Sequence, residues 1–148
     1  MFEHLYAYPA RLEAQPDGSY LVQFPDLPEA LTDGGDHAEA LTQAADCLSE
    51  TLAGRINRDE EIPPPSLPRR GQELVAPDPT MALKAAIYGA LRVRGLTVAE
   101  LARRLDIDYR QAARLVDPHC ASKLTSLKAA LDALGYQIAI AVSDKTAA

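Results

Sequence analysis

Six prolines lie close together near the middle of the 148-residue chain, and they constrain its fold more than any other feature. They are Pro63, Pro64, Pro65, Pro68, Pro77 and Pro79. Because proline fixes φ and lacks a backbone N–H group, no helix or central strand can cross the first cluster. Residues 63–68 therefore predict an extended, stiff connector, and residues 73–76 predict a short strand that completes the domain before it. The sequence thus indicates two domains, residues 1–76 and 81–148, joined near residues 77–80.

The two halves of the chain differ in charge. Residues 1–80 carry 5 Lys and Arg against 15 Asp and Glu, a net charge of −10, whereas residues 81–148 carry 10 against 6, a net charge of +4. Because a nucleic-acid binder must neutralise phosphates with Lys and Arg, only the second half is a candidate for that role. Opposite charges predict two partners of opposite sign, with two solvated surfaces of ordinary composition as the alternative.

Composition and cysteine spacing exclude several classes of protein. Hydrophobic residues make up 47% of the chain and charged residues 24%, as in folded globular proteins rather than disordered ones. No run of about 18 apolar residues predicts a membrane helix, and the first residues do not resemble a secretion signal. Cys47 and Cys120 lack CxxC spacing, which favours a reducing cytosol and buried thiols over a disulfide or zinc framework. His4, His37 and His119 are isolated, so we expect neither a metal site nor a cofactor.

The N-terminal half has the pattern of a small α+β domain. Its expected order is strand–strand–strand–helix–strand, with the first four elements at residues 6–14, 20–24, 30–33 and 37–55. Pro9 favours an edge position or a bulge for the first strand, and Asp17-Gly18 predicts a hairpin turn. Asp36, with Glu39 three residues later, predicts the N-cap of an amphipathic helix through a capping box.

A motif between the second strand and the helix carries a family resemblance. The run Phe24-Pro25-Asp26-Leu27-Pro28 is followed by Thr32-Asp33-Gly34 and then by a helix rich in alanine and glutamate. With this order of motifs after an Asp-Gly hairpin, the chain resembles the HicB antitoxin family over about residues 5–76. The resemblance implies a partial RNase H-like domain that binds and blocks HicA, a small basic toxin that cleaves messenger RNA.

Residues of this motif are the predicted toxin contacts. An acidic surface speeds association with a basic ribonuclease and competes with RNA for the same site. We therefore expect toxin binding by Asp26, Leu27, Glu29 and Asp33. A solvated loop remains the alternative for Asp26 and Glu29, whereas Asp36 is better explained as a helix cap than as a contact.

An RNase H-like fold also raises a nuclease hypothesis, which the sequence does not favour. Phosphodiester hydrolysis of that type needs several carboxylates that converge on two metal ions. The available acids come from the N-terminus, two loop positions and a helix, and they are Glu3, Asp26, Asp33 and Asp46. Because no spacing brings these acids together, we predict that the chain is not an enzyme.

The C-terminal half has the pattern of an all-α DNA-binding domain. Four helices are expected at residues 81–92, 97–105, 109–116 and 124–134. Thr97 with Glu100 predicts a capping box, Asp106 a tight turn in the left-handed conformation that Asp tolerates, and Asp108 the next N-cap. Two short helices separated by three or four residues form a helix-turn-helix. This run resembles the Xre/Cro-like repressors over about residues 83–135.

The second short helix is expected to enter the major groove with its first residues facing the bases. Gln111 can pair with adenine and Arg110 or Arg114 with guanine, although either arginine can hold phosphate instead. The predicted DNA contacts are Thr97, Tyr109, Arg110, Gln111, Arg114, Ser122 and Lys123. A helical bundle without DNA binding is the alternative.

The end of the chain predicts a dimerisation strand. After Gly135, apolar residues alternate with a period of two, which is typical of a half-buried strand. These residues are Tyr136, Ile138, Ile140 and Val142. Because no other strand is expected in this domain, we predict that the segment pairs with the same segment of a second copy. Docking onto the edge of the N-terminal sheet is the alternative.

Together these patterns predict an α+β protein with an N-terminal β-β-β-α-β domain and a C-terminal helix-turn-helix domain that ends in a dimerising strand. The predicted function is an antitoxin that inhibits a HicA-like toxin and represses its own operon by binding operator DNA. We expect a cytoplasmic homodimer or higher oligomer without membrane contact. The alternative is a stand-alone dimeric transcription regulator whose acidic domain senses another ligand.

Overall fold

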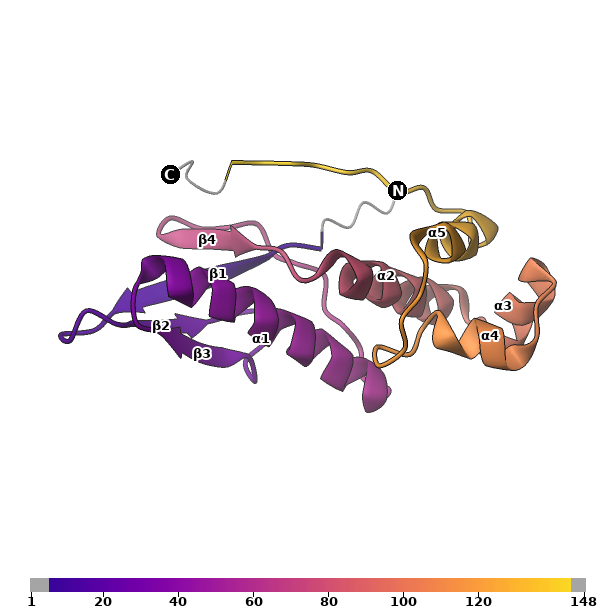
Figure 1. Cartoon of the computed structure of the whole chain (residues 1–148), viewed down its shortest axis with the longest axis horizontal. Helices are drawn as coiled ribbons and strands as arrows, with labels where there is room; N and C mark the ends of the chain where they lie inside the picture. The colour runs from indigo at the N-terminus through magenta and orange to yellow at the C-terminus, as the bar shows by residue number, and fades with distance from the viewer. Residues whose placement is uncertain (1–5, 145–148) are drawn as a thin grey trace.

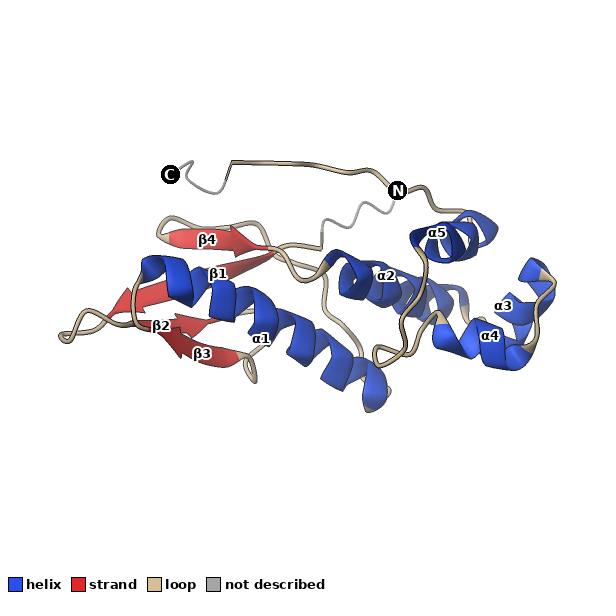
Figure 2. Ribbon diagram, in the orientation of Figure 1, coloured by secondary structure: helices blue, strands red, loops and turns tan. Residues whose placement is uncertain are grey.

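The computed structural model describes residues 6–144 and is a mixed structure with an antiparallel sheet followed by helices (Figure 1). The N-terminal half contains β1 (Tyr8–Ala14), β2 (Tyr20–Gln23), β3 (Leu31–Gly34), α1 (His37–Asn57) and β4 (Gln72–Val75). The C-terminal half contains α2 (Pro79–Arg94), α3 (Val98–Leu105), α4 (Tyr109–Arg114) and α5 (Leu124–Ala133). Each element lies within two residues of its predicted bounds. Figure 2 shows the strands at one end of the molecule and α3, α4 and α5 at the other.

The four strands form one antiparallel sheet in the order β3-β2-β1-β4. The strand β1 is therefore central, which corrects the edge position predicted from Pro9. The register explains why proline is tolerated: β2 pairs with Arg11–Ala14, whereas β4 pairs with Tyr8–Arg11. Pro9 thus has a neighbouring strand on one side only, as at a sheet edge.

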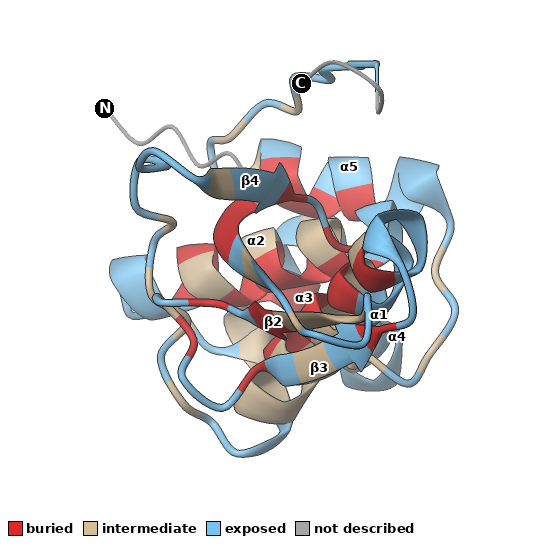
Figure 3. Cartoon of the chain, turned by 90° about the vertical axis from the view of Figure 1, so that its left-hand side faces the viewer, coloured by how far each residue is buried: buried red, intermediate tan, exposed pale blue. Residues whose placement is uncertain are grey.

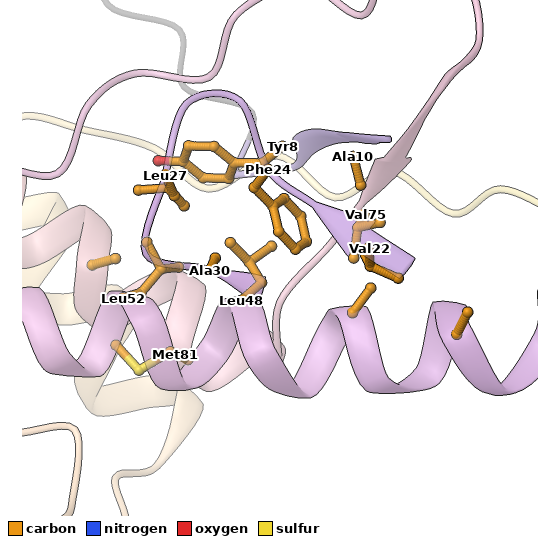
Figure 4. Packing of buried hydrophobic residues seen from close by; sticks show 13 residues of the cluster. Tyr8, Ala10, Val22, Phe24, Leu27, Ala30, Leu48, Leu52, Val75 and Met81 are labelled. Carbon is orange, nitrogen blue, oxygen red and sulfur yellow. The ribbon is translucent and has the colours of Figure 1, made fainter. Parts of the chain in front are cut away.

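Helix α1 covers one face of the sheet and forms the first hydrophobic core with it. Figure 4 shows Val22, Phe24 and Val75 on the sheet side of this core, facing Leu48 and Leu52 of α1. All five side chains are buried. Burial of each large apolar side chain stabilises the fold by about 1.5–3 kcal/mol. The alternation in the strands and the three- and four-residue spacing in the helix therefore predict this core correctly.

The Thr-x-Gly motif marks a close approach between β3 and α1. A Cβ added to Gly34 would overlap the backbone nitrogen of Ala40 and lie 2.5 Å from its Cα. Ala40 is itself fully buried at the start of α1. The glycine is therefore a packing requirement, because only a residue without a side chain lets the strand pass this close to the helix.

The proline-rich segment is an extended connector, as predicted. Residues 60–69 form neither helix nor strand, and they return from the end of α1 toward β4 (Figure 1). The hydroxyl of Tyr8 donates a 2.7 Å hydrogen bond to the carbonyl of Pro63. Asp26 Oδ2 accepts hydrogen bonds from the backbone N–H and the hydroxyl of Ser66, at 2.9 and 3.0 Å. These contacts hold the connector against the sheet domain.

Helix α2 packs into two hydrophobic cores. Met81 and Ala85 join the core between the sheet and α1. Ile87 and Leu91, further along the same helix, join the core formed with the C-terminal helices. Figure 3, viewed from the sheet end, shows buried positions on α2 and α5 as well as on the sheet. The two halves of the chain therefore share a helix rather than meeting at a flexible link.

Residues 136–144 do not form the strand that the sequence predicts there. Residues 136–144 form neither helix nor strand, and the four-stranded sheet includes none of them, so they do not dock onto its edge. A strand forms only beside a neighbouring strand, and residues 136–144 pair with none of β1, β2, β3 and β4. Tyr136 and Ile138 pack, partly buried, against the helical core, whereas Ile140 and Val142 are 81% and 93% exposed. Pairing with a second copy stays a prediction.

Candidate functional sites

The loop after β2 is held from beneath by buried side chains. The N–H of Leu27 donates to the carbonyl of Phe24 at 3.0 Å, and the N–H of Ala30 donates to the carbonyl of Leu27 at 2.9 Å. All three side chains lie in the core below the loop (Figure 4). Leu27, a predicted toxin contact, therefore supports the loop and has no exposed side-chain surface.

Two acids of this loop bind other parts of the chain. Asp26 accepts the hydrogen bonds of the connector described above. Glu29 forms a bidentate pair with Arg55 of α1, with Nε–Oε2 and Nη2–Oε1 distances of 2.7 and 2.9 Å. Arg55 also donates a 2.8 Å hydrogen bond to the carbonyl of Glu61. Because the guanidinium stabilises the charged carboxylate, the pKa of Glu29 is lowered from its ordinary value. Both acids thus hold the loop and the connector on the domain.

Asp33 lies on the face of the sheet opposite α1. The register aligns Asp33 of β3 with Leu21 of β2 and Glu13 of β1, and these positions alternate with those that face α1. Asp33 and Glu13 are exposed, and neither carboxylate forms a hydrogen bond or ion pair with the described residues. Leu31, two residues before Asp33, is 58% exposed. We call Glu13, Leu21, Leu31 and Asp33 the open sheet face, and its acids are available to a partner.

Asp36 caps α1, as predicted. Its side chain accepts a 2.8 Å hydrogen bond from the N–H of Glu39. The carboxylate of Glu39 accepts a 3.0 Å bond from the N–H of Gly35, rather than from Asp36 as a capping box requires. The carboxylate of Asp36 therefore serves as the N-cap of α1.

The helices α3 and α4 are joined by the tight turn that the sequence predicts. Thr97 Oγ1 accepts a 3.2 Å bond from the N–H of Glu100, whose carboxylate accepts a 2.8 Å bond from the N–H of Thr97. Asp106 ends α3 in the left-handed conformation, with φ 54° and ψ 47°. The N–H of Ile107 then donates to the carbonyl of Ala102 at 3.1 Å. The capping box and the turn therefore come from local hydrogen bonds.

Helix α4 begins with a second capping box, which uses a predicted base-reading residue. The N–H of Gln111 donates to Asp108 at 2.7 Å, and the N–H of Asp108 donates to the side-chain oxygen of Gln111 at 3.2 Å. The side-chain oxygen of Gln111 therefore already accepts one hydrogen bond within the chain before any contact with adenine. Tyr109 is 62% exposed, and Arg110 beside it is exposed as well.

The basic side chains of α4 and of the start of α5 are exposed. Arg110, Arg114 and Lys123 form no ion pair with the described residues. Lys123 is the N-cap of α5 and makes no side-chain cap hydrogen bond. The hydroxyl of Ser122 donates a 3.2 Å bond to the carbonyl of Arg114, which ties the segment before α5 to the end of α4. This surface presents cations that no acid of the described chain neutralises.

Sequence reasoning missed Lys84 of α2. Lys84 is 1% exposed, and its Nζ donates to the carbonyl of the last residue of α4 and to two carbonyls that follow this helix. Burial lowers the pKa of Lys84. A signal exists in the sequence, because Lys84 stands three and seven residues before Ile87 and Leu91, on the apolar face of the helix.

The titratable groups of the described residues show no metal centre. Within residues 6–144, no group of three or more His, Cys, Asp and Glu could hold a metal ion. Cys47 and Cys120 are free, and both are partly exposed, which corrects the prediction of buried thiols. His37, expected to be isolated, pairs with Glu73 at 3.0 Å.

Residues 6–144 include no helix with the length and apolar character needed to cross a membrane.

Comparison with known proteins identifies the family. A model described as HicB_like antitoxin of bacterial toxin-antitoxin system matches residues 7–86. The chain is 33% identical over 135 residues to Antitoxin HicB 1 of Photorhabdus laumondii, covering 91% of this chain and 86% of that protein. It is 33% identical over 133 residues to Antitoxin HicB of Escherichia coli K12, covering 90% and 96%. It is 30% identical over 139 residues to Antitoxin HicB of Pseudomonas fluorescens, covering 93% and 94%.

These matches first define the class: the chain is similar over most of its length to antitoxins of bacterial toxin–antitoxin systems. It belongs to the HicB antitoxin family, which confirms the resemblance carried by the motif at residues 24–34. The family model ends inside α2, so the matched segment contains the whole sheet domain and the first turns of the shared helix.

Proposed function

We propose that the protein binds and inhibits a HicA-like messenger-RNA-cleaving toxin and represses its own operon by binding operator DNA. Membership of the HicB family supports the antitoxin role. The observation that carries the wider proposal is the separation of charge, −10 for residues 1–80 and +4 for residues 81–148. An acidic surface attracts a basic ribonuclease, and a basic surface attracts DNA phosphates. The protein catalyses no reaction in this proposal, because covering the RNA-binding surface of the toxin is sufficient for inhibition.

The toxin contact is proposed on the sheet domain, which we take as the partial RNase H-like unit of residues 1–76. Asp33 is the first candidate, because it is exposed and unpaired among the described residues and lies beside the exposed Leu31. Asp26 and Glu29 contribute through the parts of their carboxylates that internal hydrogen bonds leave accessible. Leu27 contributes by holding the loop from beneath.

The DNA contact is proposed on α3 and α4, acting as the helix-turn-helix of a unit that spans residues 81–148. Helix α4 would enter the major groove, where Arg110 and Arg114 supply contacts to guanine or phosphate. Thr97 and Lys123, at the starts of α3 and α5, supply phosphate contacts. The proposed set is Thr97, Tyr109, Arg110, Gln111, Arg114, Ser122 and Lys123.

A homodimer is proposed through the C-terminal segment. Ile140 and Val142 are 81% and 93% exposed, and they continue the alternation that begins with the partly buried Tyr136 and Ile138. Two such segments from two copies would supply each other with backbone partners. A dimer also fits an operator with two half-sites one helical turn apart. Binding to operator DNA would place the protein in the cytoplasm.

Co-expression with the small basic reading frame that adjoins this gene tests the antitoxin role. The expected result is growth arrest by that frame alone, recovery when this chain is present, and a complex that co-purifies. The control is an unrelated basic protein in place of that frame, which should not co-purify with this chain. If the adjoining frame is not toxic and forms no complex, the stand-alone regulator with an acidic sensor domain becomes the better reading.

A further inference from the structure

Lys84 bonds to the segment that follows α4. Its ammonium donates to the carbonyls of Arg114, Asp117 and Cys120, at 2.8, 2.6 and 2.5 Å. Because an ammonium group has three N–H donors, this arrangement uses all of them. Arg114 is the last residue of α4, and the other two residues belong to the turn that leads toward α5. Lys84 thus acts as a cap for the end of α4 that is supplied by a different helix.

The burial of this charge has a cost that the three carbonyls offset. Lys84 is 1% exposed and is the buried charged side chain found among residues 6–144. A charge in the interior is tolerated only when hydrogen bonds replace its hydration. Carbonyls at the end of a helix carry partial negative charge and need donors, so each group satisfies the other. The carboxylate of Asp117 is used elsewhere: it accepts a 2.9 Å bond from the N–H of His119 and a 3.4 Å bond from the thiol of Cys120.

Helix α4 depends on such support because it is short. It has 6 residues, fewer than a helix needs to be stable alone. Its first turn is fixed by the capping box of Asp108 and Gln111, and its last turn is fixed by Lys84. Lys84 stands between Met81 and Ile87, which belong to the two different cores. The end of α4 is therefore tied to the part of α2 that packs against the sheet domain.

We propose that Lys84 is a positioning residue for DNA recognition, which sets the angle at which α4 meets the major groove without touching DNA itself. The inference rests on the proposed operator binding by α4. A buried ammonium makes no contact with a phosphate, so its removal takes no cation from the surface that meets DNA. Misplacement of α4 instead weakens the contacts to base edges, which carry sequence discrimination.

The test compares Lys84→Met with Lys128→Met in the full-length chain. Methionine keeps a long unbranched side chain and removes the charge and the three donors. Lys128 of α5 is the matched control, because its side chain is 62% exposed and pairs with Asp132 on the same helix at 2.6 Å. Dissociation constants are measured over a range of KCl concentrations. The probes are a duplex from directly upstream of this reading frame and a scrambled duplex of the same composition.

For Lys84→Met, we expect the affinity for the upstream duplex to fall about 10- to 100-fold, as for the loss of one or two base contacts. Its affinity for the scrambled duplex and the slope of log Kd against log salt should stay unchanged, and Lys128→Met should retain full discrimination. A merely structural role would lower both affinities together, in proportion to the folded fraction. An equal loss on both duplexes, or no loss on either, overturns the inference.

Folding of the variants is checked before their affinities are compared. If Lys84→Met does not fold by circular dichroism, Lys84→Gln, which retains two N–H donors, replaces it. Failure of both variants to fold would make Lys84 a folding residue and overturn the positioning role.

If the wild-type chain fails to discriminate between the duplexes, the proposed operator binding itself is rejected. A wild-type chain that discriminates, beside a Lys84→Met variant that does so equally well, rejects the role of Lys84 alone.

Discussion

The acidic loop after β2 and the basic helix α4 use their charged side chains differently. Asp26 and Glu29 of the loop are bound to other parts of the same chain by hydrogen bonds of 2.7–3.0 Å. Arg110 and Arg114 of α4 are exposed and have no ion pair among the described residues. The net charge of a region therefore describes its long-range attraction, whereas the contacts of each side chain decide its availability at an interface.

The largest expected effect tests the basic side of this comparison. Replacing Arg110 and Gln111 together with alanine should reduce operator affinity about 100- to 1,000-fold, because two side chains at the start of α4 lose their contacts to bases. Mobility shifts at fixed salt measure the loss. Because the side chain of Gln111 also caps α4, Arg110→Ala alone is the control that leaves the capping box intact. Neutralisation of the toxin by the double variant should stay intact. A double variant that still shifts operator DNA would contradict the assignment of α4 as the recognition helix.

The next prediction tests whether two copies of the chain bind DNA together. Replacing Ile140 and Val142 with aspartate places charges on the two most exposed apolar side chains of the C-terminal segment. We expect monomers in sedimentation velocity and a loss of operator affinity of about 100-fold, because one copy no longer brings a second to the DNA. Tyr136 and Ile138 remain in place, so the helical core is undisturbed. Dimers that persist would show that another surface joins the copies.

A smaller effect tests the acidic side. Asp33→Asn combined with Glu13→Gln removes the two unpaired acids of the open sheet face and should weaken toxin binding about tenfold. Titration calorimetry with catalytically inactive toxin measures the change. The control is Asp46→Asn, which removes an exposed acid from α1 instead. If Asp46→Asn weakens binding as much as the double variant, then general charge rather than this face attracts the toxin.

The smallest effect concerns the acids that bind internally. Glu29→Gln should lower the free energy of unfolding by about 0.5–1 kcal/mol, because its partly exposed pair with Arg55 loses its charge. Arg55 lowers the pKa of Glu29 below its ordinary value of 4.5. The stabilisation is therefore complete well above pH 4.5 and is lost as pH falls through the lower folded-state value.

Denaturant unfolding of wild type and Glu29→Gln, at pH 7 and near pH 3, measures this difference. The gap between the two proteins should shrink at the lower pH. Toxin affinity should change less than in the variant of the open sheet face. If Glu29→Gln loses more toxin affinity than the variant of the open sheet face, the toxin contacts the loop after β2 rather than that face.

Local hydrogen bonds explain why much of the fold could be predicted from the sequence. The caps at Asp36, Thr97 and Asp108 and the left-handed turn at Asp106 depend on groups within about four residues of one another. Their residue types and spacing are therefore visible along the chain. The same holds for the alternation and helical periodicity that give each strand and helix within two residues of its observed bounds.

The use of the candidate site residues could not be predicted in this way. Glu29 meets Arg55 across 26 residues, Asp26 meets Ser66 across 40, and Lys84 reaches the end of α4 across 30. Each pairing exists only after the connector and the helices have packed. A single sequence shows that an acid or a lysine is present, but not which distant group it faces. The C-terminal segment differs because its predicted partner is a second molecule.

The presence of one helix in two cores sets a rule for how such proteins can be rebuilt. Met81 and Ala85 complete the core of the sheet domain, although they stand after the proline connector. A shuffled protein that kept only the residues before α2 would expose the core at these two positions. The junction at which one C-terminal unit can be exchanged for another therefore lies within α2. Any replacement must begin with a helix that presents small or apolar side chains to the sheet domain at positions 81 and 85.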